Sequence, residues 1–174
     1  MKNNFYITTP IYYVNDIPHI GHAYTTILAD VIARYQRSLD KNVFFLTGLD
    51  EHGQKVQDAA NSNKTDPLSH CNNMSKRFTD LWAKLHISNN DFIRTTQKRH
   101  IVVVQNILNK VMKNGDIYED EYEGLYSVSE ERFITEKEAD TGDFHDIKKL
   151  KEKNYFFKMS KYQNNLIEHI NSNP

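Results

Sequence analysis

A short segment near the start of the chain carries two histidines at a spacing that suits phosphate chemistry. It reads Pro18-His19-Ile20-Gly21-His22. Histidines three residues apart share one face of the first turn of a helix, so both imidazoles can donate hydrogen bonds to one phosphate whose charge rises during a reaction. Gly21 has no side chain and lets a flat adenine ring approach the backbone. The segment predicts a nucleotide site. The alternative is a histidine pair that only caps a helix and contacts water.

The elements around this segment must place it at the edge of a sheet. Residues 5–9 are β-branched and aromatic, which predicts a strand that Pro10 ends. Helical spacing begins at His19, and its apolar face consists of Ile20, Ala23, Ile27, Val31 and Tyr35. Residues 43–47 predict a second strand. Strand, helix and strand in this order predict a parallel pair, with a helix N-terminus between them that attracts phosphate.

Asp50 follows the second predicted strand, at the carboxyl edge where parallel sheets bind ligands. It can bind a ligand there, cap the following helix, or do both. His52, two residues on, is expected to play a supporting or surface role. Cys71 lies on the apolar stripe of a helix that Asp66 is expected to cap, and it adjoins His70. Neighbours on a helix point in different directions, so Cys71 is expected to be a small buried side chain and not a nucleophile.

The composition excludes several classes of protein. The chain has 174 residues, of which 39% are hydrophobic and 26% charged, as in soluble globular proteins. With 22 Lys and Arg against 23 Asp and Glu, a nucleic-acid partner must be met by a local patch. A single cysteine forms no internal disulfide and fits a reducing compartment. We expect a cytoplasmic protein with no membrane association, whose oligomeric state the sequence leaves open.

Several separated stretches resemble the methionyl-tRNA synthetase family of class I aminoacyl-tRNA synthetases. His19-Ile20-Gly21-His22 is similar to the HIGH signature of that class, and residues 8–15, 21–26 and 45–53 look like the first half of the family's catalytic domain. Residues 91–96 and 154–157 match as well, in the same order. The resemblance covers nearly the whole chain, which makes it far more specific than the tetrad alone.

The resemblance implies a methionine–tRNA ligase reaction. Methionine and ATP, the latter with Mg²⁺, give methionyl-adenylate and pyrophosphate, and the methionyl group then moves to tRNA. By resemblance, His19, Gly21 and His22 would bind ATP, and the two histidines would be the catalytic pair. Because the carboxylate of methionine attacks the α-phosphorus, the protein's task would be positioning and charge stabilisation.

The resemblance also implies an amino-acid site. Asp50 would pair with the α-ammonium group of methionine, because a charge-assisted hydrogen bond orients the amine and leaves the carboxylate nucleophile free. Ile11 and Tyr13 would line an apolar pocket for the thioether side chain. The alternative for Ile11 and Tyr13 is plain core, since aromatic and branched residues at strand ends most often pack inside.

Lys158-Met159-Ser160-Lys161 is similar to a second family signature, KMSKS, whose lysines neutralise the phosphates of ATP. Here the fifth residue is Tyr162, and the preceding residues 155–157 predict a strand and not a mobile loop. In the family, a similar stretch lies just after the connective insert. We therefore expect Lys158 and Lys161 to be solvated lysines at a strand end.

The predicted insert departs from the pattern of many relatives, which hold zinc there with cysteine pairs. The matching stretch here is Ser127-Val128-Ser129-Glu130, and His145 nearby cannot complete a tetrahedral site. We expect no structural zinc and no metal ligands. The acidic residues 119–123 and the basic residues 148–151 are each expected to form a solvated turn.

The predicted fold class is α/β, the first half of a Rossmann-like parallel sheet with a small strand-rich connective insert. Residues 1–115 would form the half sheet, 116–157 the insert, and 158–174 the start of the second half. The rest of the sheet is missing by comparison with the family, so tRNA would be engaged through the full-length enzyme. The isolated chain is expected to be weak or inactive and to expose an unpaired strand edge.

Two other classes remain open. One is a small nucleotidyltransferase with an HxGH motif. It should carry a C-terminal phosphate-binding segment rich in Ser, Thr and Arg, but residues 162–174 contain no Arg. The other is a non-catalytic remnant or partner-binding module that keeps the first half of a synthetase.

Overall fold

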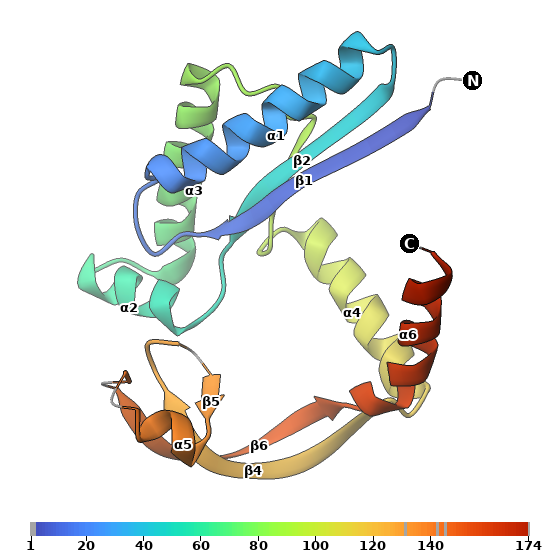
Figure 1. The fold of residues 1–174 in the computed structure, drawn as a ribbon. Coiled ribbons are helices and arrows are strands. Elements are labelled where there is room, and N and C mark those ends of the chain that lie inside the picture. Colours follow the sequence, from blue (N-terminus) through green and yellow to red (C-terminus); the bar gives the residue numbers. More distant parts are fainter. Residues whose placement is uncertain (1–2, 131, 142, 145, 174) are drawn as a thin grey trace. The chain divides into compact units, whose positions relative to one another are not determined.

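The computed structural model describes residues 3–130, 132–141, 143–144 and 146–173, in two compact units, 1–104 and 105–174 (Figure 1). The first unit contains a sheet in the order β1 (Asn4–Tyr13), β2 (Asn42–Asp50), β3 (Asp91–Arg94), and both strand pairs are parallel. The predicted α/β fold and parallel pairing are confirmed. The predicted domain boundaries after residues 115 and 157 stay predictions.

β1 does not end at Pro10, as the sequence predicts, but continues to Tyr13. Its register against β2 shifts between Thr8 and Ile11, and Pro10 lies in this irregularity. Proline has no N–H to donate to a ladder, so a strand accommodates it where the ladder is already interrupted. The strand therefore carries Ile11 and Tyr13 to the carboxyl edge of the sheet, beside the end of β2.

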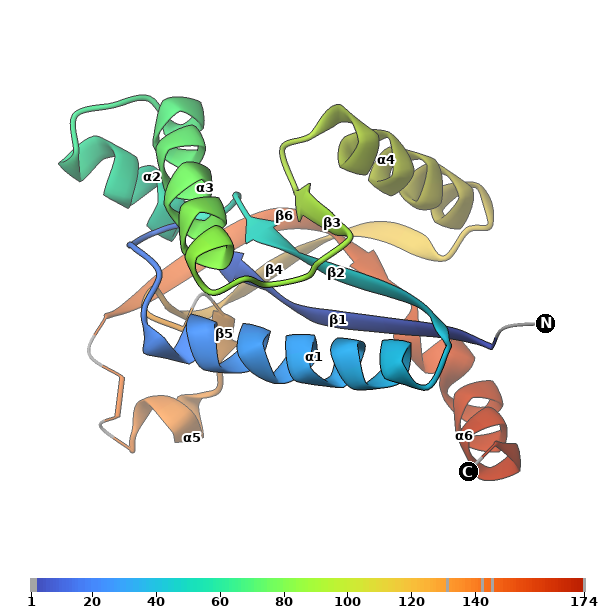
Figure 2. The ribbon, with the colours of Figure 1, turned by 90° about the horizontal axis from the view of Figure 1, so that it is seen from above.

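α1 (Ile20–Ser38) runs along β1 and β2, as Figure 2 shows from above. The apolar face that the spacing predicts is not the face that packs on the sheet, because Ile20, Val31 and Tyr35 are more than half exposed. The buried residues of α1 are Thr26, Ala29, Asp30 and Ala33. Small side chains let the helix approach the sheet closely, and the two alanines pack with Val43 and Phe45 of β2.

Two more helices belong to the first unit, α2 (Gln54–Ser62) and α3 (Pro67–Lys84), and α4 (Lys98–Lys113) begins in it and ends in the second unit. Gly53, with φ of 113°, joins β2 to α2 in a conformation that favours glycine. Asp66 caps α3, as predicted, by accepting a hydrogen bond from Ser69 N at 3.0 Å. α3 supplies much of a core cluster that consists of Tyr12, Val14, Leu49, Val56, Cys71, Phe78 and Trp82.

The strand-rich character predicted for the second unit is confirmed. Its sheet has the order β5 (Arg132–Ile134), β4 (Ile117–Ser127), β6 (Ile147–Phe157), and both pairs are antiparallel. The other elements are α5 (Glu136–Ala139), the 3₁₀ turn η1 (Met159–Tyr162) and α6 (Gln163–Ser172). The strand predicted at 155–157 is the end of β6.

The two predicted charged turns are wrong, because both segments lie on strands of one long antiparallel pair. The acidic residues lie on β4 and the basic ones on β6, where Glu123 faces Lys151 and the ion pairs run diagonally across the ladder. Lys149, Lys151 and Lys153 pair with Glu123, Glu121 and Glu119 at 2.7, 3.2 and 2.7 Å. Opposite charges facing across a ladder favour this register over a slipped one.

Within the described part of the chain, no helix has the length and apolarity needed to cross a membrane.

Candidate active site

His19 and His22 lie at the start of α1 with their rings stacked. His19 is the N-cap residue, and its Nδ1 accepts a hydrogen bond from Gly21 N at 3.1 Å. His22 Nδ1 accepts from His19 N at 3.2 Å. The ring centroids are 3.8 Å apart with an interplanar angle of 27°. Each imidazole thus satisfies a backbone N–H that the first turn of a helix otherwise leaves without an intrahelical partner.

These hydrogen bonds determine where each ring carries its proton. A nitrogen that accepts from a backbone N–H carries no proton itself, so in the neutral rings the proton is on Nε2 of both histidines. Burial lowers the pKa of His22, and the neighbouring His19 lowers it further. His22 is therefore neutral at pH 7, with Nδ1 as an acceptor and Nε2–H as a donor. Capping and ligand binding use different atoms of the ring, so the two roles are compatible.

A side chain at position 21 would collide with the His19 ring, in addition to hindering the approach of a ligand. A Cβ at this position would lie 2.9 Å from Cε1 and 3.1 Å from Nδ1 of His19. The His19 ring folds back over Gly21 to reach its N–H, and a methyl group would push the ring away. The glycine is therefore required by the histidine pair itself.

We expect NMR of ¹³C-labelled histidine in this chain to show that His22 titrates below the usual histidine pKa of about 6.5. In His19→Ala the pKa of His22 should rise but stay below that value, because burial is the larger cause. The sign follows from the neutral ring, since the cap that His22 provides is intact at neutral pH and is lost as the pH falls through the lowered pKa. A His22 pKa above the usual value would contradict this arrangement.

The ring of His22 packs against two aromatic rings, Tyr12 and Phe78, a contact that the sequence did not indicate. Its ring centroid lies 4.8 Å from that of Tyr12 and 5.3 Å from that of Phe78. The Tyr12 hydroxyl pairs with Thr26 Oγ1 of α1 at 2.9 Å. Residues 11–14 are all apolar, so no alternation in the sequence separates Tyr12 and Val14, which are buried, from Ile11 and Tyr13, which are exposed.

Ile11, Tyr13 and Asp50 lie together on the other face of the sheet. Tyr13 and Asp50 are register partners across β1 and β2, and Ile11 pairs with Gly48. Ile11 is 42% exposed and Tyr13 46% exposed, so the plain-core alternative is wrong for both. The N-cap residue of α2 is Gly53, so Asp50 is not the cap of that helix. The ligand roles of the three residues stay predictions.

The histidine pair therefore lies on one face of the end of β1, and the group formed by Ile11, Tyr13 and Asp50 lies on the other. His22 packs on Tyr12, whose side chain alternates with those of Ile11 and Tyr13. His52 is exposed in the loop after Asp50.

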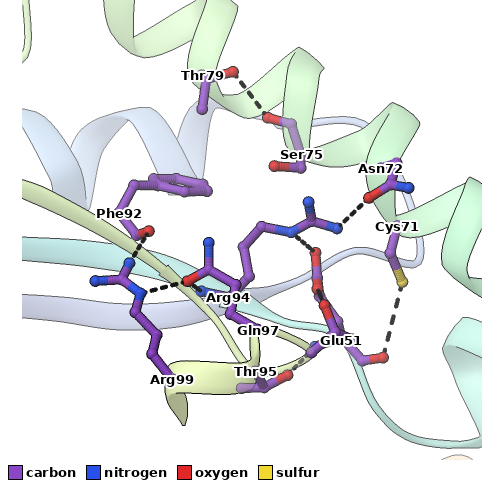
Figure 3. A network of polar contacts seen from close by, with 11 residues as sticks. Glu51, Cys71, Asn72, Ser75, Thr79, Phe92, Arg94, Thr95, Gln97 and Arg99 are labelled. Carbon is purple, nitrogen blue, oxygen red and sulfur yellow. Dashed lines mark hydrogen bonds and ion pairs between the residues drawn. The ribbon is translucent and has the colours of Figure 1, made fainter. Parts of the chain in front are cut away.

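The structure adds an ion pair beside Asp50 that the sequence analysis missed (Figure 3). Arg94 Nε lies 2.6 Å from Glu51 Oε1, and the side chain of Glu51 is fully buried. The hydroxyl of Thr96 donates to the other carboxylate oxygen of Glu51.

Cys71 is buried, as predicted, and lies near the same carboxylate. Burial and the nearby Glu51 raise the pKa of the Cys71 thiol to about 11. The thiolate is the reactive form of cysteine, so at neutral pH this side chain is not a nucleophile.

Lys158 and Lys161 bind two adjacent residues of the second unit, Gly115 and the buried Asp116. Lys161 Nζ lies 2.5 Å from Asp116 Oδ1, and Tyr162 OH donates to Asp116 Oδ2 at 2.6 Å. Lys158 Nζ donates to the carbonyl oxygen of Gly115 at 2.7 Å. The lysines do follow a strand end, as predicted, but they are bound and not merely solvated. The two lysines and Tyr162 tie the end of β6 to the start of β4.

We expect Lys161→Ala to lower the Tm of this chain by several degrees, because it leaves the buried carboxylate of Asp116 without its cation. The exposed neighbour Lys148→Ala is the control and should leave Tm within about 1 °C. The hydrogen bond from Lys161 lowers the pKa of Asp116, so the stabilisation is present at neutral pH and is lost as the pH falls through that lowered value. Thermal unfolding at pH 7 and at low pH measures both effects, and equal Tm values for the two variants would refute the role.

The residues at the position where many relatives are expected to hold zinc do not fit a zinc site. Ser127 Oγ pairs with Ser129 Oγ at 3.1 Å and accepts from Glu130 N at 3.2 Å, so these hydroxyls close a turn. In the ranges that the structure describes, no three His, Cys, Asp or Glu side chains gather as metal ligands would. His145 lies outside the described residues. The absence of structural zinc stays a prediction.

Comparison with known proteins identifies the family. Residues 5–142 match the family model described as tRNA synthetases class I (M). The chain belongs to this class I tRNA synthetase family. The match favours a synthetase over the small nucleotidyltransferase alternative.

Relatives in this synthetase family are much longer than the chain. It is 51% identical over 180 residues to a methionine–tRNA ligase of Rickettsia typhi, an alignment that covers 100% of the chain and 35% of the relative. It is 49% identical to that of Fusobacterium nucleatum over 100% of the chain and 28% of the relative. The chain thus spans about a third of the length of the curated relatives it matches.

Solved structures agree with this assignment. Mycobacterium tuberculosis methionyl-tRNA synthetase in complex with methionyl-adenylate superposes with a TM-score of 0.91 and 38% identity, over 99% of this chain and 35% of that one. LeuRS of Agrobacterium radiobacter K84, in a complex with tRNA, gives 0.81 at 19% identity, which shows the fold alone.

Proposed function

We propose that this chain carries part of the active site of a methionine–tRNA ligase, which activates methionine with ATP and transfers it to tRNA. The observation that carries the proposal is the stacked pair of His19 and His22, whose Nδ1 atoms are occupied by backbone N–H groups and whose Nε2–H groups are donors. Support also comes from relatives named methionine–tRNA ligase and from a similar structure that binds methionyl-adenylate. ATP would enter with Mg²⁺ as part of the substrate.

The first step forms one bond and breaks another at the α-phosphorus of ATP. A carboxylate oxygen of methionine attacks, pyrophosphate leaves, and negative charge accumulates on the phosphate oxygens in the transition state. Two Nε2–H donors at a helix N-terminus stabilise that charge more than they stabilise the ground state. Because the helix and the caps hold the rings in place beforehand, little reorganisation accompanies the reaction.

Asp50, Ile11 and Tyr13 would hold the methionine for this attack. Asp50 is the register partner of Tyr13, so a carboxylate stands beside an exposed aromatic ring. The carboxylate would bind the α-ammonium group, and the apolar side chains would contact the thioether. Methionine would then present its own carboxylate toward the α-phosphorus.

For the whole enzyme, we propose that it transfers methionine to tRNA and that it acts in the cytoplasm. The chain spans about a third of its relatives, so we infer that it is weak or inactive alone. It would supply the histidine pair and the half site around Asp50, and the rest of the relative's length would complete the site. A non-catalytic or partner-binding role is the competing proposal.

The test uses a chimera in which this chain replaces the matching 35% of the Rickettsia typhi relative. We expect methionine-dependent exchange of pyrophosphate into ATP by the chimera, and little or none by the isolated chain. Leucine in place of methionine is the specificity control, and the unmodified relative is the control for assay conditions. An active relative and a folded, inactive chimera would refute the proposal and favour the non-catalytic role.

A further inference from the structure

Glu51, the residue after Asp50, forms hydrogen bonds through its backbone N–H and through both oxygens of its carboxylate. Its N–H donates to Thr95 Oγ1 at 2.9 Å. Its carboxylate accepts from Arg94 Nε at 2.6 Å and from the hydroxyl of Thr96. These three partners are consecutive residues at the end of β3, the strand beside β2. The loop that begins at Asp50 is thereby attached to the neighbouring strand at three atoms.

Three consecutive residues of α3 contact the ends of the three strands. Asn72 Oδ1 accepts from Arg94 Nη2 at 2.7 Å, so Arg94 extends between the loop and the helix (Figure 3). Cys71 Sγ lies 3.8 Å from the carbonyl oxygen of Glu51. His70 Nε2 lies 2.7 Å from the carbonyl oxygen of Val14, which follows the end of β1. The helix therefore fixes the ends of β1, β2 and β3 relative to one another.

Net stability does not explain why this position carries a charge. The side chain of Glu51 is 0% exposed and that of Arg94 only 18%. Removing such a pair from water costs much of what its attraction returns, and well-packed apolar residues of similar volume usually hold a core as well or better. What an ionic pair with several hydrogen bonds adds is direction, because each bond restrains an angle as well as a distance.

Direction matters here because Asp50 is covalently joined to Glu51. With the N–H and carboxylate of Glu51 restrained, the peptide unit between the two residues is held in place, and this fixes the direction in which the Cα–Cβ bond of Asp50 leaves the backbone. We propose that Glu51 and Arg94 are positioning residues for the amino-acid site, which aim the carboxylate of Asp50 at the α-ammonium group of the substrate. This inference rests on the proposed function and goes beyond it by assigning two residues that do not touch substrate.

The test measures KM in pyrophosphate exchange by the chimera. We expect Glu51→Ala to raise KM for methionine about tenfold or more, since small misplacements of a binding group are costly, and to leave KM for ATP within about twofold. Glu51→Gln should restore KM for methionine to within about threefold, because its amide oxygen can accept from Arg94 and its NH₂ can donate to Thr96.

A methionine analogue without the amine, 4-(methylthio)butanoate, separates positioning from general damage. It lacks the group that Asp50 binds, so its inhibition constant should not change in Glu51→Ala. Asp30→Ala is the matched control, since Asp30 is also a buried carboxylate paired with an arginine, Arg34, at 2.6 Å. It should lower Tm as Glu51→Ala does and leave KM for methionine unchanged.

Arg94→Lys provides the answer if Glu51→Ala does not fold. Lysine keeps the charge but cannot donate in two fixed directions to Glu51 and Asn72, so KM for methionine should rise about three- to tenfold. The inference is overturned if KM for methionine does not change in folded variants, if the analogue weakens in parallel, or if Asp30→Ala has the same effect. Absence of exchange by the unmutated chimera would instead refute the proposed function, and the inference would fall with it.

Discussion

Replacing either His19 or His22 by alanine in the chimera lowers the kcat of methionine-dependent pyrophosphate exchange about 10²–10³-fold, the usual cost of losing one donor to a developing charge. The reason is the position of the proton, since each Nδ1 accepts from a backbone N–H and each Nε2 is left to donate. The loss should appear in kcat more than in KM, because the donors act most strongly in the transition state. The double variant should lose less than the product of the single losses, since the rings act together.

The asparagine variants decide between this role and simple capping. Asparagine at position 19 or 22 keeps an acceptor near the place of Nδ1 and lacks a donor at the place of Nε2. His19→Asn should therefore retain the Tm of the unmutated chimera and still lose exchange about 10²-fold or more. His100→Ala on α4 is the control histidine, with rates expected within twofold. A loss below about threefold in His19→Asn would leave the pair as a helix cap alone.

Asp50→Asn lowers kcat/KM for methionine at least about 30-fold, equivalent to about 2 kcal/mol, because a charge-assisted bond to the α-ammonium becomes a neutral one. Asparagine keeps the shape of the side chain, so folding should not suffer. The effect should fall on methionine and spare ATP, whose KM should stay within about twofold. Exchange measured against each substrate in turn gives both values.

The amine-free analogue gives an independent check on Asp50. Because it carries no ammonium group, it should bind the Asp50→Asn chimera as well as it binds the unmutated one. Asp58→Asn, an exposed carboxylate on α2, is the matched control and should change neither constant. An Asp50→Asn chimera with an unchanged KM for methionine would show that Asp50 does not bind the amine. If the analogue also binds the Asp50→Asn chimera more weakly, Asp50 shapes the pocket and does not bind the amine.

The sequence by itself determined the parts of this protein that depend on neighbours along the chain. Strand, helix and strand periodicity predicted the parallel sheet, and the spacing of His19 and His22 placed both rings on one helical turn. The cap at Asp66 and the burial of Cys71 also follow from local pattern. These succeed because a residue's nearest neighbours determine its backbone preference and the direction of its side chain.

Only the tertiary structure decided which face of α1 is buried and how far β1 extends. The large apolar side chains of α1 were expected to define its packing face, yet alanines and Thr26 lie against the sheet. β1 passes Pro10 because its ladder with β2 is irregular there, and this brings Tyr13 beside Asp50. Periodicity reports which residues share a face, but what covers that face is set by elements far away in the sequence.

The same limit applies to Glu51 and Arg94, which are 43 residues apart and meet only because β2 and β3 are neighbours in one sheet. Either residue alone reads as an ordinary surface charge. Parallel strands carry their ends to one edge, and there a carboxylate and a guanidinium from different strands become a single buried pair. Contacts within one helical turn follow from the spacing of residues in the sequence, so the histidine pair could be predicted. The pairing of Glu51 with Arg94 depends on which strands are neighbours in the sheet, so this ion pair could not.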